Sequence, residues 1–214
     1  MKTLIKIISH IHQSHGNNLV ENMKILIACE FSGIVRDAFS EYGHDVWSCD
    51  LKHVQDKGKK HIQGDVLNIL DDGWDMMIAH PPCTHLSVSG ARWFKDKIND
   101  GRQKSAIDFF MKLVNAPIRR ICIENPVCIM STIYRKPDQV IQPWMFGHDE
   151  SKRTCLWLKG LSRLKPTDIR DVRYNRLHNL SPSHHRAKFR SITYKGIANA
   201  MAKQWTYFCE HGHT

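Results

Sequence analysis

The sequence of 214 residues lacks several features that mark special structural classes. It has no uninterrupted apolar run long enough for a membrane-spanning helix, no internal repeat and no low-complexity stretch. Its seven cysteines form no CxxC pair and their number is odd, which argues against a dense disulfide framework. With 42% hydrophobic and 24% charged residues, the composition is typical of a globular protein with reduced, mostly buried thiols.

Acidic residues are scarce in the C-terminal part of the chain. From Ser151 onward there are 13 Lys and Arg side chains against Asp168, Asp171 and Glu210, whereas residues 1–150 are neutral overall. The whole net charge of +10 therefore belongs to the last 64 residues. A one-sided basic segment is typical of a polyanion-binding protein, nucleic acid first, although a solubilising surface is the simpler alternative.

Residues 1–22 are polar after a short apolar start, and we expect a poorly ordered extension there. Lys6 interrupts the apolar start and no small-residue cleavage site follows, so a secretory signal is not predicted. Two His- or Cys-containing groups, His184-His185 and Cys209-x-His211-x-His213, lack the spacing of a four-ligand zinc site, and we expect no metal.

Apolar runs alternate with helical patterns along the rest of the chain. The pattern predicts strands over 24–29, 44–49, 74–79, 120–123 and 155–158, a further strand ending near 64–66, and helices over 35–42 and 102–116. Such an alternation indicates an α/β fold with a mostly parallel sheet. Because ligands of these sheets bind beyond the carboxyl ends of the strands, the residues that follow each run are the candidate site.

The residues at those strand ends form an ordered series. Phe31-Ser32-Gly33 follows the first run, Asp50 ends the second, and Gly64-Asp65-Val66 ends the third. Pro81-Pro82-Cys83 and Glu124-Asn125-Pro126 follow two later runs. Each motif alone is weak, but their order and spacing resemble the DNA cytosine-C5 methyltransferase family from about Met23 to Trp205.

The resemblance implies a Rossmann-like S-adenosylmethionine-dependent methyltransferase fold with a mostly parallel central sheet and a small basic recognition insert. It divides the chain into a catalytic domain (23–158), a reduced target-recognition segment (159–193) and a C-terminal helix with its tail (194–214). It implies that S-adenosyl-L-methionine is held by a set of strand-end residues and one helical asparagine: Phe31, Ser32, Gly33, Asp50, Leu51, Asp65, Val66, Pro81 and Asn199.

The same resemblance identifies Cys83 as the nucleophile, Glu124 as the acid beside N3 of the base and Arg153 as the cation beside O2. A thiolate that adds to C6 of cytosine makes C5 nucleophilic, and the charge that develops at N3 and O2 needs an acid and a cation. This geometry requires a flipped-out base. Residues expected to bind double-stranded DNA lie in the loop after Cys83 and in the basic segment: Ser87, Arg92, Arg102, Arg170, Arg173, Arg176, Arg186 and Lys188.

The sequence departs from the family pattern at a few positions. Val35 replaces a second glycine, Thr84 replaces a glutamine, and the recognition region is only about three dozen residues long. We therefore expect a short duplex target, as suits a compact enzyme of a phage or other mobile genome, in the cytoplasm of a bacterium or an infected host cell. No membrane and no obligate protein partner are expected. The alternatives are the same chemistry on RNA, the same chemistry on a free nucleotide, which the basic segment disfavours, and a degenerate fold that only binds nucleic acid.

Overall fold

A seven-stranded sheet organises the computed structural model, which describes residues 22–53, 60–176 and 190–212. The strand order is β3-β2-β1-β4-β5-β7-β6. The strands are β1 (Lys24–Ala28), β2 (Asp45–Asp50), β3 (His61–Gln63), β4 (Met76–Ala79), β5 (Arg120–Pro126), β6 (Gln139–Ile141) and β7 (Thr154–Lys159). The first five are parallel to one another, and β7 runs antiparallel to both of its neighbours.

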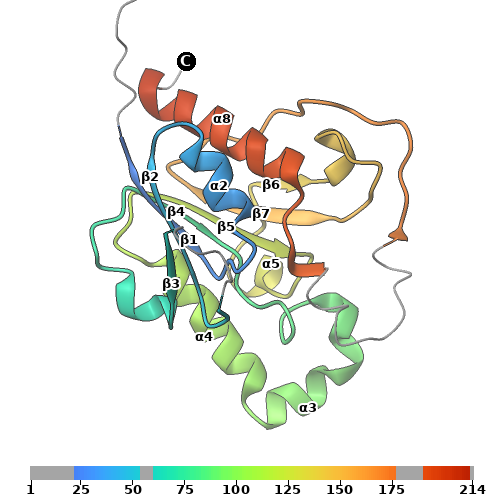
Figure 1. The fold of residues 1–214 in the computed structure, drawn as a ribbon. Helices are drawn as coiled ribbons and strands as arrows, with labels where there is room; N and C mark the ends of the chain where they lie inside the picture. The colour runs from blue at the N-terminus through green and yellow to red at the C-terminus, as the bar shows by residue number, and fades with distance from the viewer. Residues whose placement is uncertain (1–21, 54–59, 177–189, 213–214) are drawn as a thin grey trace, which may run out of the picture.

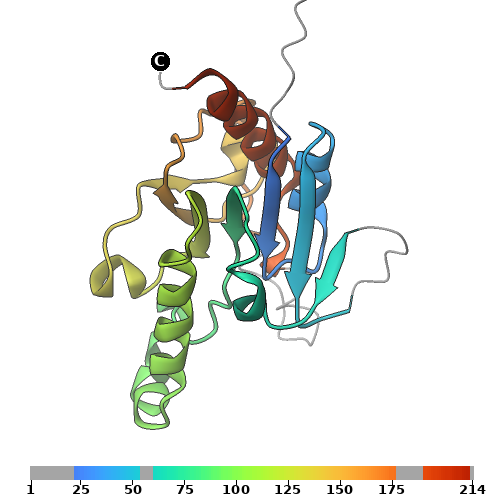
Figure 2. The ribbon, with the colours of Figure 1, turned by 90° about the vertical axis from the view of Figure 1, so that its left-hand side faces the viewer.

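Helices cover both faces of this sheet (Figures 1 and 2). The helices are α2 (Ile34–Ser40), α3 (Phe94–Asn99), α4 (Arg102–Val114), α5 (Met130–Ile133) and α8 (Lys195–His211), with short 3-10 turns η1 (Val66–Ile69), η2 (Val88–Trp93) and η3 (Pro143–Met145). In β1, Ile25 and Ile27 belong to the core cluster with α2 and α8, whereas Leu26 and Ala28 belong to the cluster with α4. The predicted Rossmann-like α/β fold is therefore confirmed.

Burial on both faces explains the continuous apolar runs of the central strands. All residues of β4 and the last four of β1 are buried, as a parallel sheet between two helical layers requires. The strands and helices expected from the sequence are present, with ends shifted by a residue or two and β5 longer by three. The sequence did not predict β6, whose three residues give too short a pattern at the edge of the sheet.

The segment after the Pro-Pro-Cys motif folds into η2, α3 and the first turns of α4, which project below the sheet (Figure 2). The buried Lys97 stabilises this projection, because its Nζ donates a 2.7 Å hydrogen bond from α3 to the carbonyl oxygen of Thr84 in the turn after β4. No helix in the described ranges is both long and apolar enough to span a bilayer.

The domain divisions expected from the sequence stay predictions. Nearly all of the expected extension, residues 1–21, lies outside the described residues, as do 177–189 of the expected recognition segment. The described part of that segment joins the catalytic body through isolated bridges from Asp168 to Phe146 and from Tyr174 to Glu150. The C-terminal helix α8 contacts α2.

Candidate active site

The carboxyl ends of β4 and β5 lie side by side and carry the two central motifs. Ala79 pairs with Ile123 in parallel register, so His80 follows beside Glu124. The buried Asn125 donates from Nδ2 to the carbonyl oxygen of Pro81 over 2.7 Å. Parallel pairing and this hydrogen bond bring the Pro-Pro-Cys segment and the Glu-Asn-Pro segment to one edge of the sheet.

Cys83 is a half-buried thiol at a tight turn, where its carbonyl oxygen accepts from the amides of Leu86 (3.1 Å) and Ser87 (2.8 Å). Burial raises the pKa of Cys83, and the negative charge of Glu124 raises it further. The positive charges of Lys152 and Arg190 act in the opposite direction without cancelling these effects. The free protein therefore holds Cys83 mainly as a thiol at neutral pH.

Glu124 is a buried carboxylate with a histidine partner. The Nδ1 atom of His80 lies 2.9 Å from Oε2 of Glu124, and the two side chains are 8% and 13% exposed. Burial alone would raise the pKa of Glu124, but the hydrogen bond from His80 and the charges of Lys152 and His80 together bring it below its ordinary value. Glu124 is therefore ionised in the free protein.

The cation next to these two groups is Lys152, one residue before the position expected from the sequence. The charge of Lys152 lowers the pKa of both Cys83 and Glu124. Arg153 is exposed, and its charge acts on Cys155 instead.

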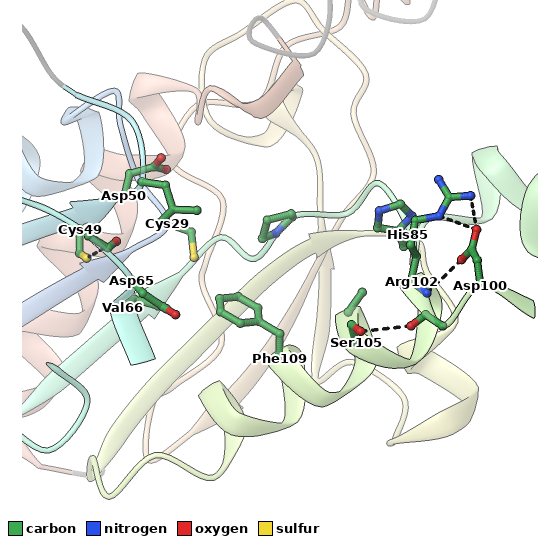
Figure 3. A pocket seen from close by; sticks show the side chains of 15 residues that line it. Cys29, Cys49, Asp50, Asp65, Val66, His85, Asp100, Arg102, Ser105 and Phe109 are labelled. Carbon is green, nitrogen blue, oxygen red and sulfur yellow. Dashed lines mark hydrogen bonds and ion pairs between the residues drawn. The ribbon is translucent and has the colours of Figure 1, made fainter. Parts of the chain in front are cut away.

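A cavity of about 580 Å³ lies beside this edge, below the ends of β1 and β2 (Figure 3). Its walls include Asp50 and Asp65 at one end, Phe109 in the middle, and His85 with Arg102 at the other end. Burial and the nearby charges of these carboxylates raise the pKa of Cys29 to about 12 and that of Cys49 to about 11, so both cavity thiols stay protonated.

The structure brings four of the nine expected cofactor residues to this cavity. Asp50, Leu51, Asp65 and Val66 line it, and Pro82 lines it where Pro81 was expected. The lining described for this cavity does not include Phe31, Ser32, Gly33 or Asn199. Sequence reasoning missed Ser105, Ala106 and Phe109, which belong to α4, although their recurrence on one helix face was a signal.

The turn after β1 is organised by a buried glutamate. The carboxylate of Glu30 accepts hydrogen bonds from the amides of Val35 (2.8 Å) and Arg36 (3.2 Å) at the start of α2. Gly33 adopts φ +72°, and a Cβ atom there would lie 2.4 Å from the guanidinium of Arg36. The chain itself thus satisfies the positive end of α2, and Gly33 has a steric role in this turn.

Two further expected cofactor residues lie outside the lining of this cavity. The ring of Phe31 lies 4.7 Å below the ammonium of Lys52, beyond the end of β2. Asn199 is exposed on α8. Near the start of that helix, Gly196 approaches the carbonyl oxygen of Phe146 so closely that a Cβ atom would lie 1.8 Å from it.

The residues expected to bind DNA from the loop after Cys83 have different surroundings. Ser87 caps η2 and contacts the hydroxyl of Ser89 at 2.9 Å. Arg92 is exposed, with its guanidinium 5.2 Å from the centre of the Trp93 ring. Arg102 forms an ion pair with Asp100, and both line the cavity.

The three described arginines of the basic segment that were expected to bind DNA are each engaged within the chain. Arg170 pairs with Asp168 at 3.1 Å, and Arg176 pairs with the buried Glu150. Arg173 stacks on the Trp144 ring with 3.8 Å to the ring centre. The other two expected contacts, Arg186 and Lys188, lie outside the described residues.

Comparisons with known proteins find likeness in structure only. No protein-family model matches the chain, and no curated protein matches it. A DNA modification methyltransferase encoded within an E. coli prophage is similar to this chain with 15% identity and a TM-score of 0.47, over 70% of this chain and 52% of that one. The Entamoeba histolytica methyltransferase EhMeth is similar with 17% identity and a TM-score of 0.46, over 70% and 58%.

The chain thus spans little more than half the length of either solved structure. A likeness at this level says nothing about activity or substrate. The fold class rests on the strand order and on the two helical layers described above.

Proposed function

We propose that this chain is an S-adenosylmethionine-dependent DNA methyltransferase that modifies C5 of a flipped-out cytosine through Cys83. One observation carries the proposal: the parallel pairing of β4 with β5 and the hydrogen bond from Asn125 to Pro81 bring the segments of Cys83 and Glu124 to one edge of the sheet. The ammonium group of Lys152 acts electrostatically on both. Nucleophilic addition to a pyrimidine ring needs these three groups together.

Each group has a defined task in this reaction. The Cys83 thiol gives its proton to the ionised carboxylate of Glu124, and its sulfur forms a bond to C6 of the base. The electron pair displaced from the C5–C6 double bond moves toward N3 and O2, where Glu124 delivers a proton to N3 and Lys152 stabilises the charge. After C5 has gained the methyl group, water takes the C5 proton, the Sγ–C6 bond breaks to release the Cys83 thiolate, and Glu124 takes back the N3 proton.

The charge of Glu124 links base binding to activation of the thiol. In the free protein its carboxylate disfavours a thiolate at Cys83. When the carboxylate shares a proton with N3 of a bound base, this repulsion decreases while Lys152 and Arg190 still favour the thiolate. Cys83 therefore becomes reactive when a base occupies the site. In the free protein its raised pKa keeps the thiol protonated and protects it from oxidation and alkylation.

The cavity beside this edge fits the cofactor that the reaction needs. Its volume of about 580 Å³ lies within the range of small-molecule sites. Asp50 and Asp65 stand where carboxylates accept hydrogen bonds from ribose hydroxyls and an adenine amine, and Val66 and Phe109 offer apolar surface to a ring. When bound there, S-adenosylmethionine supplies an electrophilic methyl group.

DNA is the proposed substrate because the loop after Cys83 carries an exposed cation and the C-terminal part of the chain carries the net positive charge. The loop after Cys83 presents Arg92 beside Trp93, and residues from Ser151 onward carry the net positive charge. Such groups contact phosphates and position a nucleic acid with little reading of sequence. The small recognition segment accords with a short target.

The decisive experiment is methyl transfer from radiolabelled S-adenosylmethionine to duplex DNA, single-stranded DNA and RNA, followed by base analysis. We expect 5-methylcytosine in duplex DNA and a covalent adduct with DNA that contains 5-fluorocytosine. Cys83→Ala should abolish both, and Cys128→Ala, which changes a buried thiol at the bridge with Ser87, should abolish neither. Methylation of RNA instead of DNA would identify RNA as the substrate. Full methyl transfer by Cys83→Ala would overturn the proposed mechanism.

A further inference from the structure

The pairing of His80 with Glu124 has no counterpart among the residues that the sequence motifs identified. His80 is the first residue after β4, and its amide donates to the carbonyl oxygen of Ala28 over 2.9 Å. Its backbone is thus tied to β1, while its ring reaches the carboxylate on β5 at 2.9 Å. Contacts to two neighbouring strands give the imidazole a fixed place.

The chemistry of the two groups determines which ring nitrogen carries the proton. An ionised carboxylate can only accept hydrogen bonds, so Nδ1 of His80 is the donor to Oε2 of Glu124. The other nitrogen, Nε2, is buried and has no hydrogen-bond partner within residues 22–53, 60–176 and 190–212.

We propose that His80 is the positioning residue of Glu124: it holds Oε2 and turns Oε1 toward N3 of the target base. This inference rests on the proposed function for its catalytic meaning, whereas the pairing itself is independent of it. With Oε2 occupied by His80, one oxygen remains for the base, and the proton that N3 receives and later returns moves through Oε1. His80 thereby keeps its own proton throughout the cycle.

The charged and titratable neighbours of Glu124 come from three strands. His80 and Cys83 follow β4, Cys122 belongs to β5, and Lys152 and Cys155 lie before and within β7. Burial raises the pKa of Glu124, and among the residues that the structure describes His80 and Lys152 lower it. Without His80, Lys152 alone would counteract the rise that burial causes in the pKa of Glu124. The carboxyl of Glu124 should therefore bind a proton at higher pH.

The pairing can be measured without substrate. In the full chain labelled with ¹³C at the glutamate side-chain carboxyl, a pH titration followed by NMR gives the pKa of Glu124, with Glu124→Gln assigning the signal. We expect His80→Ala and His80→Gln to raise this pKa by about one unit or more. His80→Asn should restore most of it, because an asparagine amide can replace the Nδ1 donor. His53→Ala, at an exposed histidine beyond β2, should change nothing.

Kinetic measurements then distinguish a positioning role of His80 from a purely structural one. With duplex DNA we expect His80→Ala to lower kcat at least about tenfold with little change in KM, and His80→Asn to recover part of kcat. An unchanged pKa of Glu124 in a folded His80→Ala protein would overturn the pairing, and an unchanged kcat would overturn its role in catalysis. If the wild-type protein transferred no methyl group, the proposed function would fail, while the titration would still decide whether His80 holds Glu124.

Discussion

Asn125 reaches from β5 to the backbone of Pro81 with a 2.7 Å hydrogen bond, and this contact sets the position of Cys83 relative to Glu124. Both partners are buried, so neither water nor another side chain easily replaces the bond. The Pro-Pro-Cys segment is therefore attached to the strand that carries Glu124.

Removal of this hydrogen bond should affect both stability and chemistry. We expect Asn125→Ala to lower the free energy of unfolding by about 1–3 kcal/mol, because the carbonyl oxygen of Pro81 would remain buried without a partner. Urea denaturation followed by circular dichroism measures this change. Asn115→Ala, at an exposed position after α4, is the matched control and should stay within about 0.5 kcal/mol of wild type.

The reactivity of Cys83 should respond to its two charged neighbours in opposite directions. Glu124→Gln removes a negative charge and should lower the pKa of Cys83, whereas Lys152→Met removes a positive charge and should raise it. The rate of alkylation by iodoacetamide, followed at Cys83 by peptide mass spectrometry from pH 6 to 10, gives the pKa. Arg153→Met should leave the Cys83 profile unchanged, and a shift equal to that of Lys152→Met would return the cationic role to Arg153.

Cofactor binding should depend on the charge at Asp65. This residue also caps η1, since its carboxylate accepts from the amide of Leu67 at 3.0 Å. Asparagine keeps that cap, so Asp65→Asn tests the charge alone. We expect S-adenosylmethionine to bind about ten- to hundredfold more weakly in titration calorimetry, corresponding to one hydrogen bond to a charged group. Unchanged affinity in Asp65→Asn, with Asp71→Asn as control, would place the cofactor elsewhere.

Two exposed arginines should differ in what their loss affects. Arg176→Ala leaves Glu150 buried without its ion partner, and we expect a loss of about 1–2 kcal/mol in the free energy of unfolding, reduced because Arg176 itself is exposed.

Arg92→Ala should leave stability unchanged but weaken DNA binding and reduce its dependence on salt. Fluorescence anisotropy with a labelled duplex at several salt concentrations tests this. Equal DNA affinity of Arg92→Ala and wild type would remove the loop from the interface.

Acid should destabilise the protein partly through His44. Its ring is buried, Nε2 lies 2.8 Å from Oγ1 of Thr206, and burial lowers its pKa below 6.5. The neutral ring contributes full stability above pH 6.5, and this contribution is lost as the pH falls toward the folded-state pKa. We expect wild type to lose more free energy of unfolding than His44→Gln between pH 7.5 and about 5, by at most about 1.4 kcal/mol per pH unit. If the free energy of unfolding of wild type and of His44→Gln fell equally over this pH range, His44 would have no part in the acid destabilisation.

Much of the fold could be predicted because its determinants are local. The runs that became β1 and β4 are apolar at nearly every position, which only a strand buried on both faces requires. Helix α4 showed its apolar face in the spacing of residues 102–116. The short edge strand β6 had no such pattern, and its place beside β7 depends on pairing with a distant segment.

The candidate site was predicted less completely. The sequence by itself determined that Cys83 and Glu124 end neighbouring apolar runs, since that follows from residue order and from the common edge of parallel strands. Only the tertiary structure showed that the charge of Lys152 reaches both groups, that His80 forms a hydrogen bond with Glu124, and that residues of α4 line the cavity. These facts depend on side-chain direction and on packing between segments far apart in the chain, which residue order does not encode.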